Sequence, residues 1–446
     1  MTQTDLQQLF AEINLTPSRK LGQNFLIDQN VSAWIARQLE VEKDDTVVEV
    51  GPGAGSLTRE ILERTENLVL VEMDGRLARF LTHHLRERPK VEIHNADACQ
   101  FDARTLFPRQ PVKLIGNLPY SAGGAIVKNF LGAHSPVTEA VLMLQREVAE
   151  RICAKPRTKD FGVLTLRVQA RWVPKILKHI GPECFFPRPQ IDSTVMRMTP
   201  RSPGDLPVYD QRLFDSTIRR GFSQRRKQLR KCLNLESDKW KEIVEKLELN
   251  ETARAEELSL EQWIDLTNLL DEHPLKDNPQ SGDELFDVVD DNNQVTGQAP
   301  RAQVHAEGLK HRATHIFLFN PAGEIFLQKR SRLKDVHPGA WDSSAAGHLD
   351  AGEDYESAAA REIVEELGLE AELDFVTELP PSEANGQEFI HLFRATSKAK
   401  PKWPASEIEF GQFFPTEVVD DWIAARPQDF AGGFLECWAA LKSDCP

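Results

Sequence analysis

Three observations predict an α/β chain with more than one domain. Short runs rich in Val, Leu and Ile recur from Val47 onward, separated by roughly 15 to 25 residues, as in βαβ units around a mostly parallel sheet. Across residues 206–270 the pattern becomes helical and strongly charged. A polar stretch with two prolines follows at 272–283, and a new strand-like run begins at Leu285.

The order of these patterns sets the expected domain boundaries. Strand-like runs of the first sheet lie at 47–50, 68–71, 91–93, 112–115 and 140–144. We expect an α/β domain at 1–200, a helical subdomain at 201–271, a linker at 272–284 and an α/β/α domain at 285–446.

The charge distribution indicates a polyanionic partner for the first part of the chain. The 446 residues carry a net charge of −15, with 40% hydrophobic and 28% charged residues, as in ordinary globular proteins. Residues 276–446 hold 15 basic against 31 acidic residues, whereas residues 151–232 hold 19 basic against 6 acidic. Such a local excess of cations favours a nucleic acid, and a solvated basic face is the alternative.

The sequence also indicates the expected environment. Residues 1–20 have no apolar signal-peptide core, and no window has membrane-spanning length, so we expect no membrane partner. Six cysteines are scattered without metal or redox spacing. We therefore expect reduced thiols and a cytoplasmic location.

A glycine-rich turn and two acidic residues form the expected cofactor site. Gly51, Gly53 and Gly55 follow a strand and open onto a helix, in a turn that lets a ligand approach the backbone. Glu72 ends the next strand, where a carboxylate can accept from both ribose hydroxyls of a nucleoside. Asp97 ends the third strand, where it can accept from an adenine amine. Each acid alone is also typical of a helix cap, but together they predict a Rossmann-like nucleoside site.

The tetrapeptide Asn117-Leu118-Pro119-Tyr120 follows the fourth strand-like run. The Asn oxygen and a backbone carbonyl can accept hydrogen bonds from an exocyclic amine, and the Tyr ring can stack on the base that carries it. Such acceptors favour the nitrogen as it becomes cationic, so they favour the transition state of amine methylation. A strand-end turn with a packed Tyr is the alternative. Together with the nucleoside site, the element predicts S-adenosylmethionine and an adenine amine.

Four segments resemble, in order and spacing, the KsgA family of 16S ribosomal RNA adenine dimethyltransferases: 20–28, 49–55, 117–120 and 185–193. The resemblance covers roughly residues 15–270 and implies a Rossmann-like S-adenosylmethionine-dependent methyltransferase. The implied substrate is a pair of adjacent adenosines in a small-subunit ribosomal RNA hairpin, methylated at N6 on the small ribosomal subunit precursor during ribosome biogenesis.

The resemblance also implies roles for individual residues. Asn117 and the Leu118 carbonyl would hold the target amine, while Tyr120 and Phe186 would stack on the two faces of the base. The residues implied to bind S-adenosylmethionine are Gln23, Asn24, Leu26, Gly51, Gly53, Glu72, Asp97 and Asn117.

Basic residues in 219–231 are the expected RNA-binding set. They interleave with Phe222 and Leu229 at helical spacing, so the apolar side chains would face a core while the cations meet phosphates. The affinity of such contacts falls steeply with salt. The residues are Arg219, Arg220, Arg225, Arg226, Lys227 and Arg230.

A second motif lies in the last domain. Gly347, Glu353 and the run 361–369 match every position of the Nudix box of diphosphate hydrolases. The run places Glu362, Glu365 and Glu366 at i, i+3 and i+4 on one helix face, where a divalent cation would relieve their repulsion. Oxygen-only ligands select Mg²⁺ or Mn²⁺. A solvated acidic helix is the alternative.

The box also predicts the limits and faces of its helix. We expect Asp354 as the N-cap and Gly368 as the C-terminal stop, with Ile363, Val364 and Leu367 facing the core. Glu362 and Glu366 are the chief expected metal ligands, Glu365 and Glu353 assist them, and Arg361 orients a carboxylate. The expected substrate is a small diphosphate whose identity the box does not specify.

The segments that flank the box resemble the isopentenyl-diphosphate-isomerase-like branch of the Nudix family. In true isomerases a Cys precedes the Gly-His pair, and Ala346 stands there in this chain, so we expect no isomerase activity. His305, His311 and His348 could form a second metal set, as in that branch, or be surface or core histidines.

The whole chain therefore has two main interpretations. The first is a bifunctional enzyme, an RNA dimethyltransferase fused to a diphosphate hydrolase. The second is a ribosome-assembly binding factor in which methylation is secondary. A narrower alternative is the related methyltransferase that modifies 23S ribosomal RNA.

Overall fold

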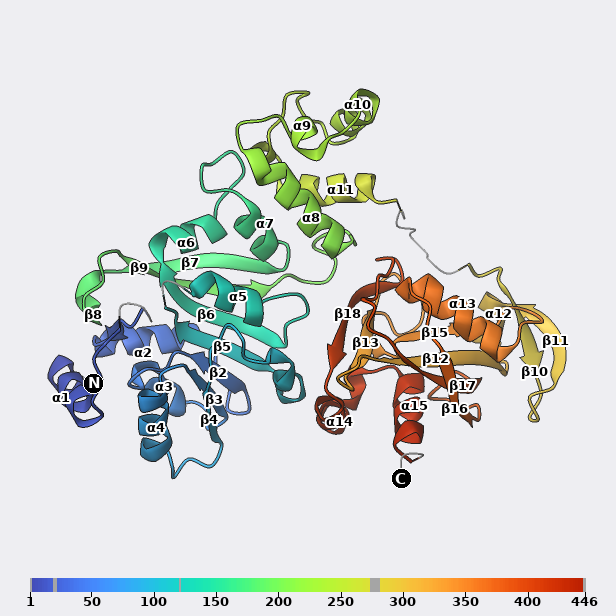
Figure 1. The fold of residues 1–446 in the computed structure, drawn as a ribbon, viewed down its shortest axis with the longest axis horizontal. Helices are drawn as coiled ribbons and strands as arrows, with labels where there is room; N and C mark the ends of the chain where they lie inside the picture. Colours follow the sequence, from blue (N-terminus) through green and yellow to red (C-terminus); the bar gives the residue numbers. More distant parts are fainter. Residues whose placement is uncertain (1, 19–21, 120–121, 273–280, 444–446) are drawn as a thin grey trace. The chain divides into compact units, whose positions relative to one another are not determined.

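The computed structural model describes residues 2–18, 22–119, 122–272 and 281–443. The chain divides into two compact units, coloured along the sequence in Figure 1. Unit 1 comprises Met1–Pro207 and Gln211–Thr267, and unit 2 comprises Val208–Asp210 and Asn268–Pro446. Much of the predicted linker at 272–284 lies outside the described residues, so the domain boundaries remain predictions.

Seven strands form one sheet in the described part of unit 1, in the order β4-β3-β2-β5-β6-β9-β7. The first five run parallel, whereas β9 is antiparallel to both of its neighbours. All five predicted strand runs lie within these strands, which confirms the predicted α/β class. The strands are β2 (Thr46–Val50), β3 (Leu68–Glu72), β4 (Val91–Asn95), β5 (Val112–Asn117), β6 (Val137–Gln145), β7 (Trp172–Ile180) and β9 (Ser193–Pro200).

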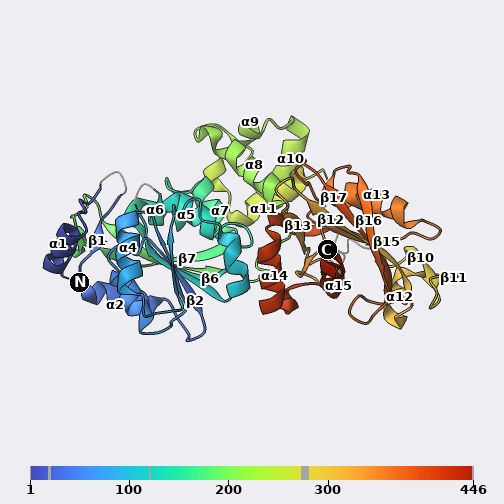
Figure 2. The ribbon, with the colours of Figure 1, turned by 60° about the horizontal axis from the view of Figure 1, so that its bottom comes forward.

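Helices cover both faces of this sheet (Figure 2). They are α2 (Gln29–Gln38), α3 (Ser56–Leu62), α4 (Gly75–His84), α5 (Gly123–Phe130), α6 (Arg146–Ile152) and α7 (Val163–Gln169). Val48 and Val50 pack in one core with α5, α6 and α7, whereas Val47 packs in a second core with α2, α3 and α4. Successive strand residues point to opposite faces, so one apolar run supplies both cores.

The amino-terminal part of unit 1 lies over the edge of the glycine-rich turn. Helix α1 (Gln3–Glu12) buries Leu6, Leu9 and Phe10 against Ala54 of that turn. The short strand β1 (Phe25–Leu26) pairs antiparallel with β8 (Phe185–Phe186), so two segments far apart in sequence meet here. The 3-10 helices of this α/β part are η1 (Ala103–Arg109) and η2 (Pro182–Cys184).

The described residues of 206–270 are helical and contain no strand, as predicted. Gly221 allows two of these helices to pack closely, because a Cβ there would lie 2.3 Å from the Trp263 ring. The helices are α8 (Gln211–Gly221), η3 (Phe222–Gln224), α9 (Leu229–Leu233), α10 (Ser237–Lys246), η4 (Ala255–Glu257) and α11 (Leu260–Leu270).

Unit 2 is built around β12 (His311–Phe319), which pairs parallel with β17 and antiparallel with β13 and β15. Within the described residues it belongs to a mixed sheet of seven strands, and β10 and β11 form a separate pair. The other strands are β10 (Leu285–Val289), β11 (Val295–Pro300), β13 (Ile325–Arg330), β14 (Trp341–Asp342), β15 (Ala345–His348), β16 (Leu373–Leu379), β17 (Glu388–Thr396) and β18 (Ile408–Phe414).

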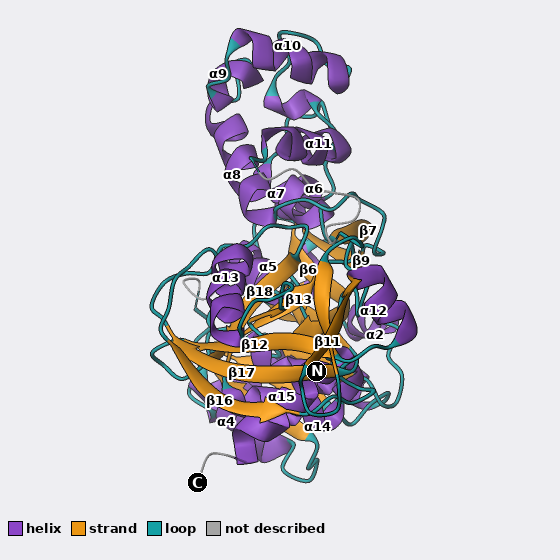
Figure 3. Ribbon diagram, turned by 90° about the vertical axis from the view of Figure 1, so that its right-hand side faces the viewer, coloured by secondary structure: helices purple, strands orange, loops and turns teal. Residues whose placement is uncertain are grey.

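Helices lie on both faces of the unit 2 sheet (Figure 3). Ile316 packs beneath α13, whereas its neighbour Phe317 meets Phe434 of α15 on the other face. The helices are α12 (Arg301–Glu307), α13 (Tyr355–Leu367), α14 (Thr416–Ala425), η5 (Pro427–Asp429) and α15 (Gly432–Ser443). Among the helices described in the two units, none combines the length and apolar character that crossing a membrane requires.

Candidate functional sites

The pocket of unit 1 lies at the carboxyl ends of its parallel strands. It is lined by all eight residues expected to hold the nucleoside cofactor: Gln23, Asn24, Leu26, Gly51, Gly53, Glu72, Asp97 and Asn117. A ligand crevice at this edge is the rule for open parallel sheets, because the loops that follow successive strands meet there.

The glycine-rich turn shapes one wall of this pocket. Gly51, Gly53 and Gly55 have φ values of +68°, +57° and +84°, a conformation in which side chains are strained. Glu72 is buried, and its two oxygens accept hydrogen bonds from the amides of Gly53 (3.0 Å) and Asp74 (2.8 Å). Burial raises the pKa of Glu72 despite these bonds. Each carboxylate oxygen keeps a second lone pair, which a ribose hydroxyl can use.

Gln23 and Asn24 hold the segment that closes the pocket. Gln23 Oε1 accepts from the Ser18 amide at 2.8 Å, and its Nε2 donates to Asp74 Oδ2 at 3.3 Å. The Asn24 carbonyl accepts from Asn117 Nδ2 at 2.9 Å. Asp74 also lines the pocket, although the sequence analysis did not predict it there. It is the N-cap of α4 and lies two residues after Glu72, a position from which its place at the pocket could have been predicted.

The target-amine element has a defined amide orientation. Because Asn117 Nδ2 donates to the Asn24 carbonyl, its Oδ1 occupies the other branch of the amide. The Leu118 side chain is buried, and Pro119 lines the pocket. Tyr120 lies outside the described residues. Phe186 is half-buried on β8, directly opposite Phe25 of β1.

The structure separates the six predicted RNA-binding residues into two groups. Arg220 and Arg230 donate to backbone carbonyls at the end of α9, Arg225 pairs with Glu256 at 2.9 Å, and Arg219 lies 3.8 Å from Asp215. These four therefore have partners within the helical part. Arg226 and Lys227 instead line a hollow together with Lys231 and Arg254, and Arg254 was missed because it lies outside the basic run.

In unit 2, helix α13 begins after Asp354 and ends at Gly368, as predicted. Glu362 and Glu366 are buried at its inner face, whereas the Glu365 side chain is 60% exposed. The prediction that Val364 faces the core was wrong, because this side chain is 45% exposed. Ile363 and Leu367 are buried one helical turn apart, and Val364 is rotated about 100° from Ile363 and about 60° from Leu367, toward solvent.

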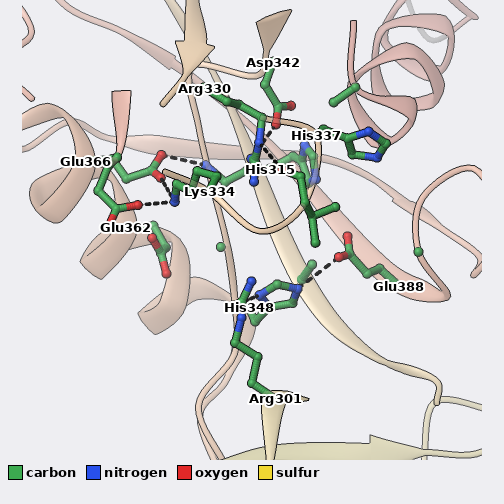
Figure 4. Close-up of a pocket in the computed structure, with 18 of the residues that line it drawn as sticks. Arg301, His315, Arg330, Lys334, His337, Asp342, His348, Glu362, Glu366 and Glu388 are labelled. Carbon is green, nitrogen blue, oxygen red and sulfur yellow. Dashed lines mark hydrogen bonds and ion pairs between the residues drawn. The ribbon is translucent and has the colours of Figure 1, made fainter. Parts of the chain in front are cut away.

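Cations contact the carboxylates on the acidic face of α13, and Figure 4 shows one of them, Lys334, beside Glu366. Arg361 donates to Glu353 (2.9 Å), Glu362 (2.7 Å), Glu365 (3.3 Å) and the His348 carbonyl (3.1 Å). Glu366 Oε2 accepts from Gln328 Nε2 at 3.1 Å and from the Ala346 amide at 3.2 Å. Lys334 lies 3.8 Å from its other oxygen.

The burial and the mutual repulsion of the α13 carboxylates favour the binding of a further cation. Burial and the charge of Glu366 raise the pKa of Glu362, and burial raises the pKa of Glu366. At Gly347 a Cβ would lie 2.0 Å from Glu362 Oε1, so only glycine leaves room for this carboxylate. Buried carboxylates with raised pKa values favour a ligand that brings positive charge, and their oxygen donors suit a hard divalent ion.

Three histidines of unit 2 meet beside this acidic face. Potential ligand atoms of His305, His311 and His348 all lie within 4.8 Å of one another. Glu388 Oε1 accepts from His348 Nε2 at 3.0 Å and lies 3.7 Å from His311 Nε2. The His348 Nδ1 lies 3.1 Å from Arg301 Nη1. Burial lowers the pKa of His348 to about 3, so its ring is neutral, and in this arrangement both of its nitrogens have hydrogen-bond partners.

Comparison with known proteins assigns both units. The family model described as ribosomal RNA adenine dimethylase matches residues 14–272, more than half of the chain. The chain belongs to this family. A second model, the NUDIX domain, matches residues 309–431, so unit 2 contains a NUDIX domain.

Named relatives match the dimethylase unit. The ribosomal RNA small subunit methyltransferase A of Clostridium acetobutylicum is 35% identical over 272 residues, which are 60% of this chain and 99% of that protein. The protein of the same name from Alkaliphilus oremlandii is 38% identical over 57% of this chain and 91% of its own length. The solved structure of the 23S rRNA methyltransferase ErmE is 28% identical, covers 56% of this chain and all of that one, and has a TM-score of 0.46.

In the dimethylase unit, Glu49 is a buried carboxyl beside the cofactor pocket. It is 1% exposed and accepts a hydrogen bond from Thr58 Oγ1 at 2.7 Å. Burial raises its pKa from 4.5 to about 8. Between these pH values the folded state binds a proton that the unfolded state has released. The contribution of Glu49 to stability is therefore largest at low pH and is lost as the pH rises toward 8.

We predict that Glu49→Gln flattens the pH dependence of dimethylase stability, because the neutral amide cannot ionise in the core. Calorimetric melting between pH 5 and pH 8 should show a smaller fall in Tm for this variant than for the wild type. Glu63→Gln, which changes an exposed carboxyl after α3, is the matched control. An equal pH dependence in Glu49→Gln and the wild type would contradict the prediction.

Proposed function

We propose that the dimethylase unit methylates the N6 amines of two adjacent adenosines in 16S ribosomal RNA, with S-adenosylmethionine as methyl donor, during ribosome biogenesis. The observation that carries this proposal is the oriented amide of Asn117, which lines the same pocket as Glu72 and Asp97. Relatives named small subunit methyltransferase A, which this chain matches over nearly their full length, support the same substrate.

Each pocket residue has a role in this proposal. S-adenosylmethionine supplies an electrophilic methyl group when bound. Glu72 accepts from the ribose hydroxyls and Asp97 from the adenine amine of that cofactor. Asn117 Oδ1 and the Leu118 carbonyl accept from the target amine, which aligns its lone pair and stabilises the positive charge that develops on nitrogen. Tyr120 and Phe186 stack on the base after it leaves the RNA helix.

The proposed partner is the small ribosomal subunit precursor. Arg226 and Lys227, with Lys231 and Arg254, form a cationic hollow that suits backbone phosphates. Arg219, Arg220, Arg225 and Arg230 contribute to RNA binding mainly by holding the helical part in shape. Methylation by an enzyme, rather than binding alone, is favoured because all eight residues expected to hold the cofactor, Asn117 among them, line one pocket.

We propose that the NUDIX domain hydrolyses a diphosphate linkage with Mg²⁺ or Mn²⁺. The supporting observation is the pair Glu362 and Glu366, buried with raised pKa values beside a glycine that makes room for them. These two would hold the metal, with Glu365 and Glu353 assisting. A bound divalent ion polarises phosphate and lowers the pKa of water.

The cations around the same pocket suit a diphosphate. Arg301, Arg330 and Lys334 line it, and Lys334 lies beside Glu366 of α13, so phosphate oxygens and metal ligands can be held at once (Figure 4). Arg361 donates to Glu353, Glu362 and Glu365 at once and so holds these carboxylates close together in fixed positions. Ala346 lines the pocket where isomerases have a thiol, which agrees with hydrolysis rather than isomerisation.

A second metal position is favoured by the histidine cluster. His305 Nε2 is buried with no hydrogen-bond partner among the described residues, and burial lowers the pKa of His305. An orphaned buried nitrogen next to two further imidazoles and a carboxylate matches the donor set of a transition metal. We propose that His305, His311, His348 and Glu388 hold a divalent ion that supports the structure of this pocket.

The methyltransferase proposal predicts dimethyladenosine at two adjacent positions when undermethylated small subunits are incubated with labelled S-adenosylmethionine. Asn117→Ala should lower the rate by about 10²- to 10³-fold, because it removes an acceptor that acts in the transition state. Mass spectrometry of the RNA measures the product. Methylation confined to the large subunit would instead support the 23S alternative, and binding without any methylation would support the assembly factor.

The hydrolase proposal predicts that Glu362→Gln abolishes phosphate release from small diphosphates and leaves RNA methylation unchanged. Mutation of residues that only contact a metal ligand typically weakens metal binding by roughly 10- to 100-fold. Glu362→Gln removes the charge of a ligand itself, so we expect a larger loss of metal affinity. Glu356→Gln, an exposed carboxyl on the same helix, is the matched control. Hydrolysis at the wild-type rate in Glu362→Gln would contradict the assignment.

The second metal position predicts a separate loss of metal in His311→Asn. Metal analysis by mass spectrometry, after dialysis against Mn²⁺ or Zn²⁺, should show one bound ion fewer than in the wild type. His83→Asn in the dimethylase unit also removes one histidine, and its metal content should equal that of the wild type. The same metal content in His311→Asn and the wild type would rule out the cluster as a metal site.

A further inference from the structure

Helix α1 lies outside the family match, which begins at residue 14, yet it packs on the methyltransferase pocket. A capping box between Thr2 and Asp5 begins the helix, and its buried face consists of Leu6, Leu9 and Phe10. This face shares a core with Phe25 of β1 and with Ala54 of the glycine-rich turn. The helix therefore contacts both the cofactor turn and the strand pair that carries Phe186.

Three aromatic rings connect these parts. The Phe10 ring meets Phe25 edge to face, with centroids 4.9 Å apart and an interplanar angle of 61°. It also stacks on Phe186, with centroids 6.5 Å apart and an angle of 29°. Beyond Phe25 the contact continues to the cofactor turn, because a Cβ at Gly53 would lie 3.0 Å from the Phe25 ring.

The strand pair by itself restrains Phe186 weakly. β1 and β8 each contain two residues, so the ladder offers two cross-strand pairs. Further bonds join residues 24–27 to the rest of the site: from Ser56 Oγ to the Leu26 carbonyl (2.8 Å), from the Ile27 amide to the Cys184 carbonyl (2.9 Å) and from Asn117 Nδ2 to the Asn24 carbonyl (2.9 Å). These bonds fix the backbone, and the orientation of the Phe186 ring depends on the rings that it touches.

We propose that Phe10 is a positioning residue for the target adenosine: it holds Phe186 in place and links this ring, through Phe25, to the cofactor turn. The inference rests on the proposed methyltransferase function, in which Phe186 stacks on the extruded base. A ring that is held before the base arrives loses less side-chain entropy on binding, so Phe10 favours the productive complex without contacting either substrate.

The first test replaces the ring and keeps the apolar volume. Phe10→Met should lower kcat/KM for small ribosomal subunits by about three- to tenfold, the range expected for one aromatic pair. Its affinity for S-adenosylmethionine, measured by calorimetry, should stay within about twofold of the wild type. Phe10→Tyr retains the ring and should restore the rate. Leu6→Ala, a cavity in the same core without a ring contact to Phe186, should lower Tm and leave kcat/KM unchanged.

The second test measures coupling between the two rings. Phe186→Leu should lower kcat/KM, and adding Phe10→Met to it should cause little further loss, because the two residues act as one unit. The fluorescence of 2-aminopurine at the target position in an RNA hairpin reports stacking, and Phe10→Met should reduce the quenching that the wild type produces.

The possible failures are distinguishable. A wild type that methylates small subunits while Phe10→Met does so equally fast overturns this inference alone, as do additive effects of Phe10→Met and Phe186→Leu. A comparable rate loss in Leu6→Ala shows that α1 merely stabilises the fold and also overturns it. A wild type without methyl transfer overturns the proposed function and the inference together.

Discussion

Burial of carboxylates is the constraint around which both pockets are built. Glu49 and Glu72 in the first unit, and Glu362 and Glu366 in the second, lie out of water at the edge of a pocket. Taking a charge out of water costs several kcal/mol, so each carboxylate must find donors or become neutral. Backbone amides donate to Glu72, and the Thr58 hydroxyl donates to Glu49. In the second unit Arg361 donates to Glu362, and Lys334 lies beside Glu366.

The glycines at these sites have the same physical cause. Gly53 lends its amide to Glu72 in a conformation that side chains rarely adopt, and Gly347 leaves the space that the Glu362 carboxylate fills. In each case the backbone comes close to an acidic group, and a side chain would hold it away. The two units have different folds and chemistry, but both place a glycine where a charge has to approach the main chain.

In the dimethylase unit, much of the site depends on contacts between distant segments. The Asn24 carbonyl sets the amide of Asn117, 93 positions later in the chain, and Phe25 pairs with Phe186 across two short strands. The segment that closes the proposed cofactor pocket therefore also contacts Asn117 and Phe186, the residues proposed to hold the target base. Methyl transfer requires the cofactor and the amine to be aligned within a fraction of an ångström. Residues that contact both binding places fix this alignment better than two independent sets of residues would.

Local patterns in the sequence were sufficient for the five parallel strands of the first sheet, for the start and end of α13 and for the glycine-rich turn, because each depends on neighbouring residues; the antiparallel β9 and its neighbour β7 were not predicted. Local patterns failed for Val364, since a one-residue shift on a helix turns a side chain from core to solvent. They also grouped six basic residues by proximity in sequence, although four of these have partners within the helical part. Arg254 and Phe10 could not be found this way, because neither carries a motif.

The sequence by itself determined the two units, their fold classes and the motif side chains at both pockets, because motif spacing and strand periodicity are local properties of the chain. Only the tertiary structure decided which way the Asn117 amide points, which cations line the basic hollow and which histidines meet Glu388. These features depend on contacts between residues that are far apart in sequence, and such contacts exist only once the strands have paired and the helices have packed.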